Sequence, residues 1–191
     1  MMKNSAFAGF IVWSILLCGG EPHASAQTPR ELGPTDFKAY APPRTSARIS
    51  EFSGLPVPRY SSLRYDKVNG RSGPSLDYPV SWTYERLGLP VVIVRESQEW
   101  RKIRDPQGDE VWVHRRMLAG ERTAITTTRG AMYRDPDVDA GALATYQAGA
   151  VMTLGECGGD WCRVEAEGRK GWAPKQQLWG ADDLQINSPA G

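Results

Sequence analysis

From about residue 60 onward, short runs of apolar and polar residues alternate, and turn-forming residues separate them. The run Leu-Pro-Val-Val-Ile-Val at 89–94 is rich in β-branched residues and predicts a strand. Alternating runs at 99–103 and 110–113 predict two more strands, since side chains of a half-buried strand alternate between its faces. Between them, Asp-Pro-Gln-Gly at 105–108 has the residue order of a type I turn.

The segment after these strands is too short for an α-helix. His-Arg-Arg-Met at 114–117 predicts one 3₁₀ turn, and Leu-Ala-Gly at 118–120 predicts a last short strand. In the opening segment, we expect Asn69, Gly70, Gly73 and Pro74 to bend a strand. Five short strands without a long helical pattern indicate a small barrel, which closes on itself to remove strand edges.

The pattern then occurs a second time. Trp100 and Trp112 are 12 positions apart, and Trp161 and Trp172 are 11 apart, and each pair is followed by Leu-x-Gly at the same distance. The one length change falls in a polar turn, where insertions are tolerated. A fixed spacing of this kind predicts a repeated structural unit, with a second barrel over about 121–181.

The first 58 residues have a different character. A basic residue, an apolar run of about a dozen residues and Ala-Ser-Ala at 24–26 predict a secretory signal peptide over 1–26. Lipidation at Cys18 and a retained anchor helix are the alternatives. Residues 27–58 are rich in proline and predict an extended leader, either a spacer or a ligand for a proline-binding groove. Residues 182–191 are expected to be a frayed tail.

Charge and cysteine content limit the partners and the cellular compartment that we expect for this protein. The chain of 191 residues has a formal net charge of +1 and no basic or acidic run, so neither nucleic acid nor a membrane surface is an expected partner. We expect no stable membrane insertion once the signal is removed. Beyond the signal, only Cys157 and Cys162 remain, and an even pair in an exported chain predicts a disulfide.

The disulfide has one geometric difficulty. Alternation places Cys162 inside with Val164 but Cys157 outside, and we expect the loop at 158–159 to break that alternation. In the first unit, Glu96 and Arg101 occupy the corresponding places, where an ion pair could have the same role.

The sequence argues against catalysis. His114 has no evident serine or cysteine nucleophile to activate, and no nucleophile-elbow motif occurs. Two cysteines and one distant histidine fall short of a zinc ligand set. We therefore expect no enzymatic activity, no cofactor and no metal.

The motifs at 68–80, 88–94, 99–103, 111–120, 160–164 and 171–180 together resemble the bacterial SH3-like domain family of exported proteins. The resemblance covers about 60–180. It implies an all-β fold of two tandem five-stranded SH3-like barrels with short 3₁₀ turns, over 59–120 and 121–181. It also implies a binding role, often at the cell wall, without specifying a ligand.

Strand alternation separates the tryptophans from the core. Trp100 and Trp161 lie three positions before Ile103 and Val164, so they point to the opposite face. They either cap the open end of each core, line a groove, or lie where the barrels meet. The candidate ligand-binding residues are Trp82, Tyr84, Trp100, Trp112, Tyr133, Trp161 and Trp172.

Two functions fit these features. The first is an exported, periplasmic or secreted, module that binds peptidoglycan or its peptide stems, gripping a repetitive polymer at two points. The second is an adaptor that docks another exported protein. The partner is therefore a cell-wall polymer or an exported protein.

Overall fold

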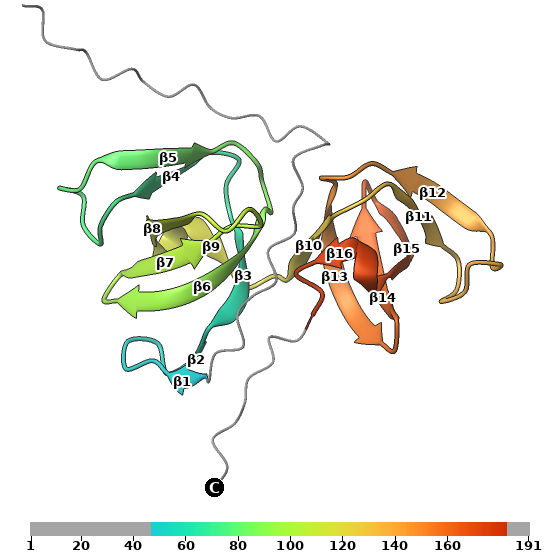
Figure 1. Cartoon of the computed structure of the whole chain (residues 1–191), viewed down its shortest axis with the longest axis horizontal. Helices are drawn as coiled ribbons and strands as arrows, with labels where there is room; N and C mark the ends of the chain where they lie inside the picture. Colours follow the sequence, from blue (N-terminus) through green and yellow to red (C-terminus); the bar gives the residue numbers. More distant parts are fainter. Residues whose placement is uncertain (1–46, 183–191) are drawn as a thin grey trace, which may run out of the picture.

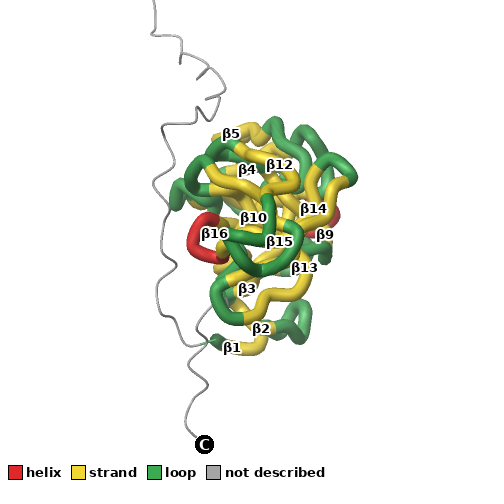
Figure 2. The backbone as a smooth tube through the Cα atoms, turned by 90° about the vertical axis from the view of Figure 1, so that its right-hand side faces the viewer, coloured by secondary structure: helices red, strands yellow, loops and turns green. Residues whose placement is uncertain are grey.

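The structure, a computed structural model, describes residues 47–182. The expected signal peptide, the first part of the leader and the tail from residue 183 lie outside the described residues. Two β-rich units lie side by side (Figure 1). Among the described residues, the only helical segments are two short 3₁₀ turns (Figure 2). The fold is all-β, as predicted.

The first unit is a curled antiparallel sheet with the strand order β5-β4-β8-β7-β6-β3-β9. Its elements are β3 (Arg59–Leu63), β4 (Val68–Arg71), β5 (Val80–Tyr84), β6 (Pro90–Ser97), β7 (Trp100–Arg104), β8 (Glu110–His114), η1 (Arg115–Met117) and β9 (Leu118–Ala119). The strands expected at 89–94, 99–103, 110–113 and 118–120 are all present, and the 3₁₀ turn lies between β8 and β9. The backbone N–H of Gly108 donates to Asp105 O at 3.0 Å, which confirms the turn at 105–108.

The sheet has seven strands where we expected five, because the opening segment folds into the hairpin β4–β5. Asn69 lies in the regular part of β4, so the expectation of a bend was wrong there, whereas the register of β4 shifts between Gly70 and Arg71. Gly70 has another role. A Cβ there would lie 2.5 Å from Val111 Cγ2, so only glycine lets β4 cross this close to β8.

The second unit repeats the first strand for strand, with the order β12-β11-β15-β14-β13-β10-β16. Its elements are β10 (Thr123–Thr126), β11 (Gly130–Tyr133), β12 (Ala142–Tyr146), β13 (Val151–Gly158), β14 (Trp161–Ala166), β15 (Arg169–Pro174), η2 (Lys175–Gln177) and β16 (Leu178–Trp179). The two orders match one to one, so the predicted tandem repeat is confirmed.

The end of the expected leader is not an unpacked segment. β1 (Arg48–Ile49) pairs with β2 (Pro56–Val57) in a short hairpin against the first barrel. The Val57 side chain is buried, and the Ser50 hydroxyl donates a hydrogen bond to Glu96 of β6. These contacts fix 48–57 to the barrel, which a composition rich in proline did not indicate.

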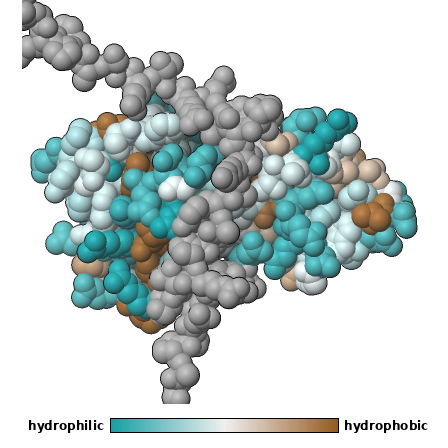
Figure 3. Space-filling model, in the orientation of Figure 1, coloured by the Kyte–Doolittle hydropathy of each residue, from teal (hydrophilic) through white to brown (hydrophobic). Residues whose placement is uncertain are grey.

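Each unit has its own core, and the first core also takes side chains from the second unit. Ile125 and Trp179 pack with the buried residues of the first barrel. The rings of Trp179 and Tyr60 meet edge to face, with centroids 5.6 Å apart. The Thr123 hydroxyl donates to Gly88 O at 2.6 Å across the same contact. The face in Figure 3 is largely hydrophilic, with apolar side chains in small patches, because most of the apolar surface is used in these cores.

Candidate functional site

The outer face of β7 and β8 is the starting point for the site. Ile103, Val111 and Val113 point inward and are buried. Their neighbours Trp100 and Trp112 point outward and are half-buried. This confirms the separation of indoles from core residues that strand alternation predicted.

Three rings gather on this face, and we call them the first aromatic cluster: Trp100, Trp112 and His114. Trp100 pairs across the strands with His114, and their rings meet edge to face at 5.6 Å. Trp112 is the diagonal neighbour of Trp100, a separation that large aromatic side chains can bridge. The cluster therefore offers flat apolar surface with polar edges, which suits sugar rings and extended peptides.

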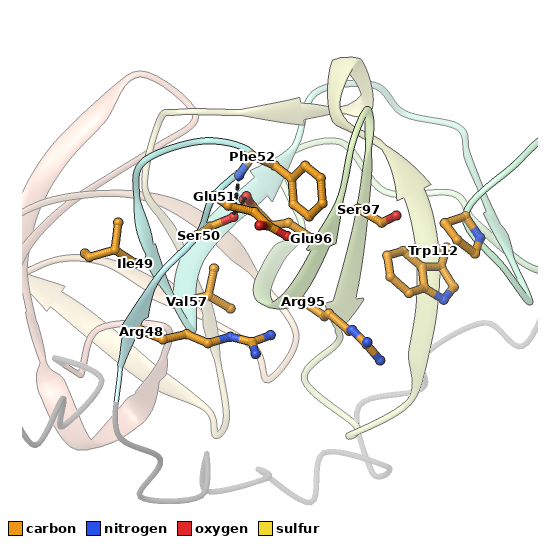
Figure 4. Close-up of a pocket in the computed structure, with 11 residues that line it drawn as sticks. Arg48, Ile49, Ser50, Glu51, Phe52, Val57, Arg95, Glu96, Ser97 and Trp112 are labelled. Atoms are coloured by element: carbon orange, nitrogen blue, oxygen red, sulfur yellow. Dashed lines mark hydrogen bonds between the residues drawn. The ribbon is translucent and has the colours of Figure 1, made fainter.

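A groove of about 530 Å³ borders this cluster. Figure 4 shows Trp112 on one side and the β1 hairpin side chains, among them Ile49 and Phe52, on the other, with Arg95 and Ser97 of β6 between them. Its other lining residues are Arg48, Ser50, Glu51, Val57, Pro74 and Glu96. The groove thus combines one aromatic wall with a polar floor, and part of the expected leader forms its far wall.

Glu96 holds that far wall in place. Its buried carboxylate accepts hydrogen bonds from Ser50 and Arg59, and it pairs with Arg101, whose Nε lies 3.0 Å from Glu96 Oε1. Burial acts to raise the pKa of Glu96, but the hydrogen bonds from Ser50 and Arg59 outweigh it and lower the pKa below its ordinary value. Glu96 therefore stays ionised and ties the hairpin to the barrel.

The second barrel carries a second aromatic cluster: Tyr133, Trp161 and Trp172. The two tryptophans occupy the positions of Trp100 and Trp112, whereas Tyr133 occupies the position of Arg71. Tyr133 meets Trp161 edge to face at 5.5 Å and lies opposite Trp172 across β11 and β15. Arg163 lies opposite Trp172 on its other side. All three rings are half-buried and lie on the outer face of their sheet.

The other two candidate residues lie elsewhere. Tyr84 is buried in the first core, and its hydroxyl donates to Asp105 Oδ2 at 3.2 Å. Trp82 packs beside Tyr84 with ring centroids 6.4 Å apart and lies against the same core. The structure thus brings together five of the seven aromatic candidates, in two clusters, and places Trp82 and Tyr84 with the core.

Several residues of the site were not predicted. His114, expected in the 3₁₀ turn, ends β8 and lies on Trp100, and its Nδ1 accepts the backbone N–H of Arg116 at the start of η1. Its position two residues after Trp112 is a signal of a shared face. Arg95, Ser97 and the β1 hairpin join the groove through tertiary packing, for which the local pattern has no signal.

Charged side chains frame the first cluster without filling it. Lys102 and Arg104 both pair with Glu110, and Lys102 Nζ lies 2.7 Å from Glu110 Oε2. Arg71, opposite Trp112, donates to the carbonyls of Leu76 and Tyr78 and so braces the loop between β4 and β5. These cations are engaged in structure, which leaves the rings as the main surface for a ligand.

The predicted disulfide between Cys157 and Cys162 is present, with their Cα atoms 4.0 Å apart. The alternation of side chains between the two faces of the sheet breaks before the loop at 158–159, where it was expected to break. The register of β13 shifts between Leu154 and Cys157, whereas Gly158 still pairs with Trp161. Within residues 47–182, no group of three or more metal-ligating side chains occurs, and no helix has the length and apolarity to cross a membrane.

Comparison with known proteins agrees with this geometry. The model of the bacterial SH3 domain matches twice, at residues 64–120 and 126–180. No curated protein matches the chain. Among solved structures, NlpC2 from Trichomonas vaginalis is similar at 14% identity over 64% of this chain and 48% of that one, with a TM-score of 0.30.

NlpC1 from the same organism is similar at 14% identity, over 79% of this chain and 51% of that one, also with a TM-score of 0.30. This chain therefore spans about half the length of these two structures. The family model matches more than half of the chain, and its two matches coincide with the two barrels. The chain belongs to the bacterial SH3 domain family, and it carries two tandem copies of the domain.

Proposed function

We propose that this protein is a non-catalytic, exported module that binds peptidoglycan or its peptide stems through its two aromatic clusters. The observation that carries the proposal is the repetition of the cluster. Trp100 and Trp112 of the first barrel recur as Trp161 and Trp172 of the second, on the outer face of the same strands. A fold that needed these rings only for its core would bury them, as it buries Ile103 and Val164.

The chemistry of the clusters fits such a polymer. Half-buried indoles provide stacking surface for sugar rings and for extended peptide chains, and polar groups at the rim provide orientation. Two clusters held on one chain can engage a repetitive polymer at two points, which raises the overall affinity without new contacts. The disulfide and the family membership support an oxidising, extracytoplasmic location.

The test is co-sedimentation of the purified protein with cell-wall sacculi. We expect the protein to sediment with sacculi, and we expect Trp100→Ala/Trp112→Ala and Trp161→Ala/Trp172→Ala each to weaken sedimentation strongly. Tyr65→Ala is the matched control, because Tyr65 is an exposed aromatic residue outside both clusters. If the wild-type protein stays in the supernatant, the cell-wall proposal fails and an adaptor for another exported protein becomes the better interpretation.

A further inference from the structure

A second groove, of about 550 Å³, lies on the first barrel and shares no lining residue with the groove beside Trp112. We call it the arginine groove. Five arginines line it, and no acidic residue is among its described lining residues: Arg59, Arg64, Arg101, Arg115 and Arg116. This concentration of positive charge contrasts with a net charge of only +1 for the whole chain.

Three of the arginines pair with two nearby acids, so one positive charge among them is not neutralised. Arg59 and Arg101 share the buried carboxylate of Glu96, and Arg115 pairs with the exposed Glu99. The other two, Arg64 and Arg116, form no ion pair within the described part of the chain. Arg64 uses its Nε to donate to Leu118 O at 3.2 Å, and Arg116 is exposed to solvent. The groove therefore retains donors and positive charge for a ligand.

The second barrel shows that the fold does not require these arginines. Arg64 N donates to Met117 O, and Thr127 N donates to Gln177 O in the same way, so Arg64 corresponds to Thr127. By the same matching of η1 with η2, Arg116 corresponds to Gln176.

The matching extends to two of the other arginines. Arg101 corresponds to Cys162, and Arg115 corresponds to Lys175. Three of these four positions are uncharged in the second barrel. The same scaffold folds without charges at the positions of Arg64, Arg101 and Arg116, so these three arginines are specific to the first copy. Arg59 and Arg115 correspond to the basic residues Arg122 and Lys175.

Apart from Ser53 and Ser61, the rest of the groove is mainly apolar. Ile93 and Leu118 are buried beneath it, while Leu55 and Tyr60 lie at its edge. A guanidinium matches the two oxygens of a carboxylate in a planar, bidentate geometry. From this combination we propose that the arginine groove binds an acidic peptide segment, with carboxylates on Arg64 and Arg116 and an apolar side chain between Leu55 and Tyr60. A phosphate polymer would use the charges but leave the apolar part of the groove without a partner.

This inference does not rest on the proposed cell-wall function, because the two sites share no residue. The experiment measures fluorescence anisotropy of a labelled peptide of Leu-Glu-Pro repeats, added to the intact protein. The matched probe replaces each glutamate with glutamine. The test variant is Arg64→Thr/Arg116→Gln, which installs the residues of the second barrel. The control variant is Arg129→Gln/Arg134→Gln, which removes two exposed charges of the second barrel.

We expect the glutamate peptide to bind in a salt-dependent manner, and the test variant to weaken binding by about tenfold or more. The control variant and the glutamine peptide separate a site from general charge attraction. Equal binding of both peptides, or equal weakening in both variants, would overturn the proposal. Inorganic polyphosphate that binds this groove more tightly than the glutamate peptide would also overturn it, in favour of a phosphate polymer.

Discussion

Glu96 and Arg101 face each other across β6 and β7 at the same register at which Cys157 and Cys162 face each other in the second barrel. One copy closes this hairpin with a buried ion pair, and the other closes it with a covalent bond. Both pairs are predicted at these places from the sequence. The ion pair has a further role that the disulfide lacks, because Glu96 also binds Ser50 and Arg59.

The Glu96→Gln variant should therefore be strongly destabilised. Removing one partner leaves Arg101 buried without its counter-charge, a change that costs about 3–5 kcal/mol of unfolding free energy. Denaturant unfolding measures the loss, and limited proteolysis near residue 52 reports release of the β1 hairpin. Glu85→Gln is the control, since Glu85 forms an exposed pair with Lys67 and its loss should cost less than about 1 kcal/mol. Equal, small losses in both variants would show that the Glu96 pair is not important to the fold.

Removing the disulfide should have a smaller effect. The bridge closes a sequence separation of 5, for which the chain-entropy estimate is about 2 kcal/mol. We expect Cys157→Ala/Cys162→Ala to lower the unfolding free energy by about that amount and to retain the fold. Intact mass after thiol alkylation under denaturing conditions checks that the wild-type protein carries the bond. Two alkylated cysteines in protein from an oxidising compartment would contradict it.

Trp100 and Ile103 should separate binding from stability. Ile103 is fully buried, so Ile103→Ala should cost about 2–5 kcal/mol. Trp100 lies half-buried on the outer face, so Trp100→Ala should cost less stability and weaken co-sedimentation with sacculi. Thermal melts of the two variants decide the matter. A melt of Trp100→Ala as low as that of Ile103→Ala would show that the indole is mainly structural.

Asp105 should make the stability fall as the pH rises. Burial raises the pKa of Asp105 to about 6, against an ordinary value of 3.8, and the nearby Asp109 adds to this, although backbone N–H groups stabilise the carboxylate. The folded protein therefore holds this proton more tightly than the unfolded chain does. Stability from this group is complete below about pH 4 and is lost as the pH rises through about 6.

The test compares wild type with Asp105→Asn, whose amide oxygen can still accept the loop N–H groups. Between pH 4 and pH 7, wild type should lose about 2–3 kcal/mol relative to this variant. The Asp66→Asn variant, in an exposed loop, should follow the wild-type profile. Parallel pH profiles for wild type and Asp105→Asn would contradict the raised pKa.

Trp179→Ala should destabilise the first barrel although it lies in the second. Its ring packs into the first core against Tyr60, and truncating a buried tryptophan costs about 3–5 kcal/mol. Hydrogen exchange at β3 and β6 should increase along with exchange at β16. Trp172→Ala, on the outer face, serves as the comparison and should leave exchange at β3 unchanged. Faster exchange confined to the second barrel would mean that the contact does not support the first.

Local patterns predicted most of the fold because strands, turns and repeats are encoded over a few residues. Alternation alone placed Ile103 inside and Trp100 outside, and the spacing of tryptophans located the second barrel. Features that depend on distant packing were missed. Trp179 is the middle residue of the second Leu-x-Gly motif, as Ala119 is of the first. Only the three-dimensional contact with Tyr60 reveals the role of Trp179.

The candidate site was predictable to a similar extent. All residues of both clusters except His114 were among the candidates, since outward-facing indoles on a small barrel require a partner surface. Trp82 and Tyr84 share the strand β5 with exposed Val80, but the curl of the hairpin turns their rings toward the core. The groove walls formed by residues 48–52 could not be predicted, because nothing local to a proline-rich segment specifies what it packs against.

The packing of Ile125 and Trp179 into the first barrel has a consequence for the order in which the chain acquires its structure. A ribosome makes the polypeptide from its N-terminus, so β3 to β9 are complete well before residue 179 has been added. Until then, the N-terminal half lacks Trp179 in its core and exposes the apolar surface that this side chain covers. The boundary at Gly120 divides the sequence into two repeats. A gene fragment cut there would nevertheless encode a first barrel that lacks part of its core, so the two repeats have to be inherited together.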